Sequence, residues 1–98
     1  MSLRIVFRPA ARAEFDEACD WYERQRAGLS ADFVACVQET LDRICVAPKA
    51  HASVFDDVRR ALVRRFPYSV LYKEEPDQIV VIGIFHGKRD PKVWKDRR

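Results

Sequence analysis

The side chains best suited to chemistry are cationic, and they are concentrated in the second half of the chain. They are Arg59, Arg60, Arg64, Arg65, Lys88, Arg89, Lys92, Lys95, Arg97 and Arg98, although the formal net charge of all 98 residues is only +3. Guanidinium and ammonium groups bind phosphates and carboxylates through charge-assisted hydrogen bonds. This distribution predicts a phosphate backbone or an acidic peptide as the partner of the second half. The alternative is a solvated sheet face that binds nothing.

Histidine is the other residue type here that could move a proton near neutral pH. The chain has two: His51 in a polar link, and His86 directly before Gly87, where turn and packing roles are more common than catalysis. The three cysteines form no Cys-x-x-Cys pair, and the histidines form no His-x-x-x-His pair. The sequence therefore predicts neither a metal site nor a disulfide framework, and no glycine-rich loop indicates a nucleotide cofactor.

The N-terminal segment is predicted to form a strand followed by a helix. Residues 4–8 are rich in β-formers, and Pro9 suits the first turn of a helix that continues to about residue 27. Apolar residues recur along this helix at helical spacing, so we expect Tyr22 inside and Trp21 at the flank of the core.

A second helix is predicted to complete a helical hairpin. Gly28 can adopt the left-handed conformation that closes the first helix, and Ser30 is the expected cap of the second. This helix is expected from about Ala31 to Val46, and Pro48 marks its end.

Beyond a polar link from Pro48 to Ser53, the pattern changes to strands. Three segments rich in Val, Ile, Tyr and Phe are expected to be strands, at Val58–Phe66, Tyr68–Glu74 and Gln78–His86. The last is apolar on both faces, which is typical of a central strand. We therefore predict an α+β fold with an N-terminal strand, a helical hairpin and a three-stranded antiparallel meander, with the helices on one face of the sheet. Residues 1–98 are expected to form a single domain.

The chain resembles a known superfamily in the order of its motifs. The strongest match is Arg64-Arg65-Phe66-Pro67-Tyr68-Ser69-Val70-Leu71-Tyr72, followed by Ile79 to Phe85 and then by His86-Gly87-Lys88-Arg89-Asp90-Pro91-Lys92-Val93-Trp94. With Ala11, Glu14, Phe15 and Asp20-Trp21-Tyr22 in the first helix, this pattern resembles the RelE/ParE toxins, in particular the plasmid-stabilisation members similar to ParE. The resemblance implies the toxin of a type II toxin–antitoxin system. The C-terminal segment of its antitoxin would lie across the toxin and neutralise it, giving a hetero-oligomer.

Two activities are known in this superfamily, cleavage of messenger RNA on the ribosome and inhibition of DNA gyrase by binding. The ribosome-dependent nucleases commonly have an arginine at the position of Ser69, and several have a C-terminal tyrosine where this chain has Trp94; the arginine after the last strand is retained as Arg89. One charged group on a transition-state phosphate contributes about 2 to 4 kcal/mol. The resemblance therefore favours a ParE-like gyrase inhibitor over a RelE-like mRNA endoribonuclease, with an inactive antitoxin-binding module as a third reading.

Candidate site residues follow from these alternatives. Metal-free RNA cleavage needs a base for the 2′-hydroxyl, cations for the developing phosphorane and an acid for the leaving oxygen. The predicted catalytic residues, if the chain is a nuclease, are His86, Arg89 and Arg64, and Tyr72 is a further available type. The residues predicted to bind a partner or nucleic acid are Arg60, Arg64, Arg65, Lys88, Arg89 and Trp94. We expect no metal and no cofactor, and a cytoplasmic location because the sequence shows neither a signal peptide nor an apolar membrane span.

Overall fold

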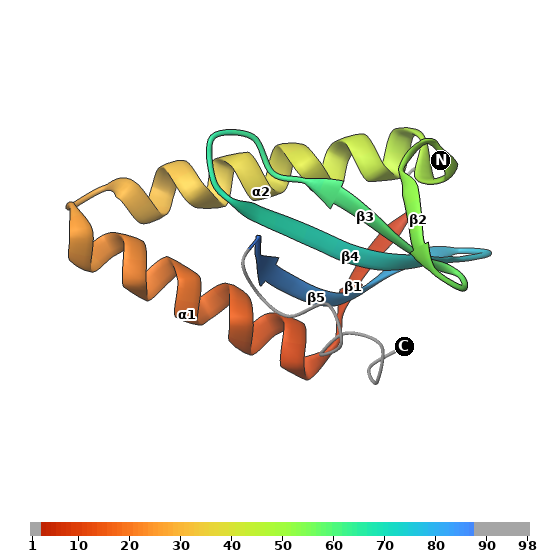
Figure 1. Ribbon diagram of the computed structural model, residues 1–98, viewed down its shortest axis with the longest axis horizontal. Helices are drawn as coiled ribbons and strands as arrows, with labels where there is room; N and C mark the ends of the chain where they lie inside the picture. Colours follow the sequence, from red (N-terminus) through yellow and green to blue (C-terminus); the bar gives the residue numbers. More distant parts are fainter. Residues whose placement is uncertain (1–2, 88–98) are drawn as a thin grey trace.

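The structure is a computed structural model that describes residues 3–87. Its elements, in order, are β1 (Arg4–Phe7), α1 (Pro9–Gln25), α2 (Leu29–Val46), the short 3-10 helix η1 (Pro48–Ala50), β2 (Ala52–Phe55), β3 (Val58–Leu62), β4 (Tyr68–Glu75) and β5 (Gln78–His86). Figure 1 shows the two long helices side by side against a strongly twisted sheet. The predicted α+β class and helical hairpin are confirmed.

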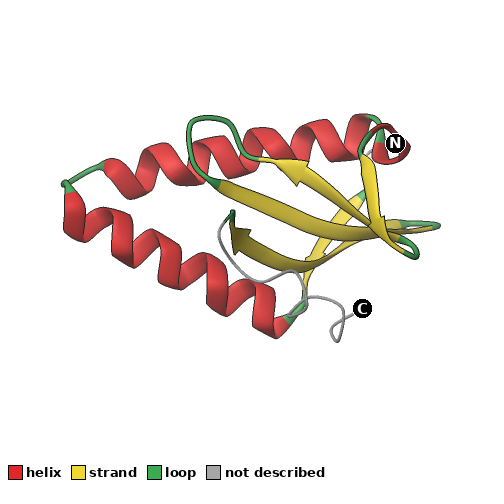
Figure 2. Cartoon of the chain, in the orientation of Figure 1, coloured by secondary structure: helices red, strands yellow, loops and turns green. Residues whose placement is uncertain are grey.

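The five strands form one sheet in the order β1-β5-β4-β3-β2. The predicted meander is present, because β3, β4 and β5 pair antiparallel. The N-terminal strand β1 joins the same sheet but runs parallel to β5, with Ile5 opposite Ile79. This places β5 between two strands, as its apolar character on both faces predicted. Figure 2 shows how the helices and strands segregate within the fold.

The turn between α1 and α2 has a different cap from the one predicted. Gly28 has a φ of +88° and is itself the N-cap of α2, while Ser30 lies within the first helical turn. The capping acceptor is Glu23 of α1, whose carboxylate accepts the Ser30 hydroxyl at 2.6 Å and the backbone N–H groups of Gly28 and Ser30 at 3.1 and 3.2 Å. A helix N-terminus has unpaired N–H groups and the positive end of the helix dipole, both of which favour a carboxylate.

The main core lies between the helices and one face of the sheet. Val70 and Tyr72 of β4 and Ile79, Val81 and Ile84 of β5 pack with helix residues such as Phe33. The step from Val81 to Ile84 is three residues because the β4–β5 register shifts between Leu71 and Tyr72. An aromatic cluster closes the open end of this core: Tyr22 and Phe33 each pack against Phe66 and Tyr68, with ring centroids 4.9 to 6.0 Å apart. Tyr22 is buried and Trp21 is half exposed, as expected from their positions on α1.

The other face of the sheet carries a second, smaller core. Its buried residues are Val58, Leu71, Val80, Ile82 and Phe85. No residue of α1 or α2 belongs to this cluster within the described part of the chain. β5 therefore contributes to both cores, which explains why its sequence lacks the polar alternation of a one-sided strand.

Two of the predicted boundaries are wrong. The segment predicted as a strand from Val58 to Phe66 ends at Leu62, because Arg65 adopts a φ of +70° in a turn and the Val63 N–H donates to the Tyr68 carbonyl at 2.9 Å. The supposed polar link contains η1 and the beginning of β2, an edge strand whose Val54 packs against the second core. β2 has four residues, and Val54 is the one that packs against this core, so its sequence has too little apolar alternation to predict a strand.

Candidate functional site: a groove beside α1

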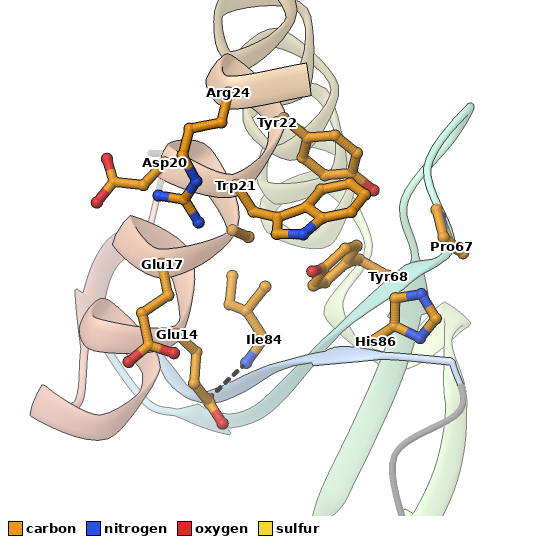
Figure 3. A pocket seen from close by; sticks show the side chains of 11 residues that line it. Glu14, Glu17, Asp20, Trp21, Tyr22, Arg24, Pro67, Tyr68, Ile84 and His86 are labelled. Carbon is orange, nitrogen blue, oxygen red and sulfur yellow. Dashed lines mark hydrogen bonds between the residues drawn. The ribbon is translucent and has the colours of Figure 1, made fainter. Parts of the chain in front are cut away.

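A groove of about 740 Å³ lies between α1 and the adjoining ends of β4 and β5. We call it the α1 groove. Figure 3 shows the lining side chains, which are Glu14, Glu17, Ala18, Asp20, Trp21, Tyr22, Arg24, Pro67, Tyr68, Ile84 and His86. Its volume is within the range of about 300 to 1,000 Å³ that is typical of ligand-binding sites.

One wall of the groove is a single stripe of α1. Glu14, Glu17, Trp21 and Arg24 follow one another at i, i+3, i+7 and i+10, a spacing that places them on one helix face. The Glu14 carboxylate accepts the backbone N–H of Ile84 at 3.1 Å and so fixes this wall to β5 (Figure 3). This bond becomes possible because β1 ends opposite Val81, leaving the last part of β5 beside α1.

His86 lies at the opposite wall, at the end of β5. It is opposite Tyr68 in the β4–β5 register, and the two rings meet edge to face at 5.3 Å. Tyr68 in turn packs against Tyr22, so the imidazole rests on the aromatic cluster of the core. His86 is half-buried at the mouth of the groove and packs against this cluster, and its catalytic role stays a prediction.

The electrostatic character of the groove is acidic. Its lining includes the carboxylates of Glu14, Glu17 and Asp20 against the single guanidinium of Arg24. Carboxylates lining a concave site concentrate cations and repel phosphates. Among the described residues, the lining around His86 therefore disfavours a phosphodiester substrate.

Arg64 and Arg65 do not line the α1 groove. Arg64 is in the β3–β4 turn, and its guanidinium pairs with Glu39 of α2 at 3.2 Å. Arg65, in the same turn, lies over the Phe66 ring, with its guanidinium carbon 5.9 Å from the ring centroid. Neither residue is on a strand, although both fall within the segment that was predicted to be one. Lys88, Arg89 and Trp94 lie outside the described residues.

Ser69, where the nucleases commonly have an arginine, is on the face of the sheet that points away from the helices. Ser69 is only 6% exposed and is opposite Leu62 of β3 and Phe85 of β5 in the sheet register. Arg60 is opposite Leu71, two residues along β4 from Ser69, so Arg60 and Ser69 share this face. The only basic candidate of β3 on this face is therefore Arg60, and it is exposed.

Tyr72 is unsuited to acid–base chemistry. Its ring is fully buried, and its hydroxyl donates to the Pro48 carbonyl at 2.6 Å. Burial raises the pKa of Tyr72 to about 12, while nearby Arg59 lowers it and Glu74 raises it further. The structure thus assigns this hydroxyl to holding η1 against the sheet.

Within residues 3–87, no group of three or more His, Cys, Asp or Glu side chains is arranged to hold a metal ion. No described helix is long and apolar enough to cross a membrane. The acidic α1 groove was not predicted from the sequence, although the i, i+3, i+7, i+10 spacing of Glu14, Glu17, Trp21 and Arg24 indicates a common helix face. The sequence does not indicate that the end of β5 lies opposite this face.

The protein is a small α+β domain with a helical hairpin on a mostly antiparallel sheet. It has an acidic surface at the α1 groove and exposed arginines on β3 and the turn that follows it. Residues 5–91 match the family described as "ParE toxin of type II toxin-antitoxin system, parDE". The chain belongs to this family and is a toxin component of a type II toxin–antitoxin system.

A solved structure described as "Chromosomal ParDE TA system from P. aeruginosa" has a similar fold. The TM-score is 0.74 at 18% sequence identity, over 87% of this chain and 96% of that chain. At this identity the likeness shows the shared fold alone. No curated protein sequence matches the chain significantly.

Proposed function

We propose that this toxin inhibits DNA gyrase by binding it, and that a cognate antitoxin holds the toxin inactive in the cytoplasm until it is needed. Membership of the ParE family supports this proposal. The observation that carries the choice of binding over catalysis is the surroundings of the described candidate groups. His86 lines an acidic groove, Arg64 pairs with Glu39, and Ser69 occupies the arginine position of the nucleases on the opposite sheet face.

The arginines suit recognition of a partner better than chemistry. Arg60, Arg64 and Arg65 are all exposed, on β3 and on the turn that follows it. A segment of an antitoxin with carboxylates at matching spacing can form charge-assisted hydrogen bonds with them. Lys88, Arg89 and Trp94 are further predicted partner-binding residues that lie outside the described residues. The expected assembly is a hetero-oligomer of toxin and antitoxin.

The test of the target is a supercoiling assay with purified gyrase, relaxed plasmid and the purified toxin. We expect loss of supercoiling or accumulation of cleaved DNA as toxin is added, with both effects reversed by the antitoxin. Supercoiling that is unchanged at saturating toxin would count decisively against a gyrase target.

A ribosome-dependent endoribonuclease is the second candidate, and one observation favours it. Arg60 shares the sheet face of Ser69 and is exposed, so it could supply the phosphate-binding cation that Ser69 cannot. This candidate predicts codon-positioned cuts in messenger RNA on translating ribosomes, abolished by Arg89→Ala. Intact messenger RNA after incubation with toxin and ribosomes would exclude it.

An inactive antitoxin-binding module is the third candidate. The neighbouring gene distinguishes the inactive module from the gyrase inhibitor and the endoribonuclease, because a functional toxin needs an antitoxin that is produced with it. A short adjacent reading frame that encodes a DNA-binding segment and an acidic amphipathic tail supports a working pair, and its absence favours the inactive module.

A further inference from the structure

The second core is almost fully buried, although no residue of α1 or α2 in the described part of the chain belongs to it. It lies on the face of the sheet that points away from the helices, which we call the outer face. Ser69 and Phe85 pair across β4 and β5 on this face, and their exposed fractions are 6% and 4%. An antiparallel sheet face that packs against nothing stays in contact with water. A further part of the protein must therefore cover Ser69 and Phe85.

The described apolar neighbour of the second core does not reach these two residues. Val54 of β2 packs against the cluster next to Val58, because β2 pairs with the first residues of β3. Ser69 pairs with Leu62, four residues further along β3, a separation of about 13 Å at about 3.3 Å per residue. Val54 therefore shields one end of the second core and leaves the other end to a different cover.

The cover is narrow and is part of this chain. Leu62 sits beside Ser69 on the neighbouring strand, about 5 Å away, and yet 64% of its surface is exposed. The border of the cover thus falls between β3 and β4, so the cover has the width of a single segment of polypeptide. These exposed fractions hold for one copy of the chain on its own, so neither a second copy nor a partner protein supplies the cover.

Of the two segments outside the described residues, one begins beside the covered positions. Residues 1–2 precede Arg4, which pairs with Gln78 at the start of β5, the end away from Phe85. Residues 88–98 begin two positions after β5 ends. We propose that residues 88–98 fold back over the outer face of β4 and β5 and that Trp94 anchors them on the second core.

Trp94 is the one large apolar side chain of this segment. The segment also contains Pro91 and Val93, and its other eight residues are charged. A tryptophan buries about 150 to 250 Å² when it enters a core. Between Gly87 and Trp94 the chain can extend about 23 Å at about 3.3 Å per residue. That reach exceeds the length of the second core along β5, which is about 17 Å.

This placement separates the roles predicted for the basic C-terminal residues. Trp94 becomes part of the second core and is not a contact for a partner. Lys88 and Arg89 stay in water, because unpaired lysine and arginine side chains are almost never fully buried. Together with Arg60, which is exposed on the same face, they form a cationic border around the covered core.

Trp94 reports its own burial once the other tryptophan is replaced. Trp21→Phe leaves Trp94 as the single tryptophan of the chain. We expect its emission at a shorter wavelength than that of tryptophan in water, and weak quenching by iodide, which does not enter an apolar core. Emission and quenching equal to those of free tryptophan would overturn the proposal.

Thiol labelling tests whether the segment covers the sheet. Ser69→Cys places a thiol under the proposed cover, and Leu62→Cys places one beside it on β3. Labelling by a maleimide is measured by mass spectrometry of the peptide that contains each thiol, with the buried Cys36 of the main core as reference. Adding Trp94→Ser should speed labelling at residue 69 by about tenfold or more, because the cover then opens locally. Residue 62 and Cys36 should change by less than about twofold.

The controls separate loss of the cover from loss of the fold. Trp21→Ser removes the half-exposed tryptophan of α1 and should leave labelling at residue 69 unchanged. If Trp94→Ser also speeds labelling of Cys36, the milder Trp94→Leu takes its place and the same rates decide the outcome. Protection of residue 69 that survives both Trp94 variants would overturn the proposal. Protection that is lost on dilution would assign the cover to a second copy of the chain and would overturn it as well.

Discussion

At the scale of single residues, the Tyr72 hydroxyl links η1 to the sheet. It donates to the Pro48 carbonyl at 2.6 Å from a fully buried ring. Tyr72→Phe removes the donor and leaves the carbonyl without that partner, so we expect the free energy of unfolding to fall by about 1 kcal/mol. Urea denaturation followed by circular dichroism measures this change. An unchanged midpoint would show that the bond adds nothing to stability.

The same residue makes stability depend on pH in the alkaline range. Burial raises the pKa of Tyr72 from its ordinary value of 10.0 to about 12, so between these values the unfolded chain loses the phenol proton while the folded chain keeps it. The contribution is therefore complete below pH 10 and is lost as the pH rises toward 12, at a limiting rate of about 1.4 kcal/mol per pH unit. We expect the advantage of the wild type over Tyr72→Phe, about 1 kcal/mol below pH 10, to fall to zero within this window and then to change sign. A difference that stays constant from pH 10 to about pH 12 would contradict the assignment.

At the scale of elements, the helical hairpin is closed by the Glu23 carboxylate. The Ser30 hydroxyl and the backbone N–H groups of Gly28 and Ser30 lower the pKa of Glu23 below its ordinary value of 4.5. A lowered carboxyl pKa contributes stability above the unfolded value and loses it as the pH falls through the folded value. Glu23→Gln should therefore lower the melting temperature at neutral pH, and the difference from the wild type should narrow in acid. Equal melting temperatures at pH 7 would show that the cap is dispensable.

The packing of Phe85 on the central strand β5 requires that residue 83 be a glycine. A Cβ at Gly83 would lie 2.9 Å from the Cζ atom of Phe85, which is on the same face of β5. We expect Gly83→Ala to lower the free energy of unfolding by about 1 to 3 kcal/mol, because the buried Phe85 ring must shift in a packed cluster. Gly87→Ala is the matched control, since a Cβ there would meet only the Pro67 carbonyl at 3.6 Å. If both variants unfold at the same denaturant concentration, the second core is looser than its packing indicates.

At the scale of the whole molecule, the sequence predicted what depends on strong periodicity. The hairpin helices and the central position of β5 follow from runs of apolar residues whose spacing is set by the element itself. The parallel pairing of β1, the edge strand β2 and the turn at Arg65 depend on contacts between distant segments, which leave little trace in local spacing. The same limit applies to the site. The spacing of the α1 residues that line the groove can be seen in the sequence, but the position of His86 across the groove from them cannot. The extent of the domain and the roles of Lys88, Arg89 and Trp94 stay predictions.

The central claim is that this toxin acts on gyrase by binding and not by turnover, and a stoichiometric titration tests it most directly. Supercoiling activity is measured at a fixed gyrase concentration well above the dissociation constant while toxin is added. The account predicts inhibition that rises in proportion to toxin and reaches its plateau at a fixed molar ratio of toxin to gyrase. Full activity throughout the titration, or complete inhibition at a small fraction of the gyrase concentration, would contradict it.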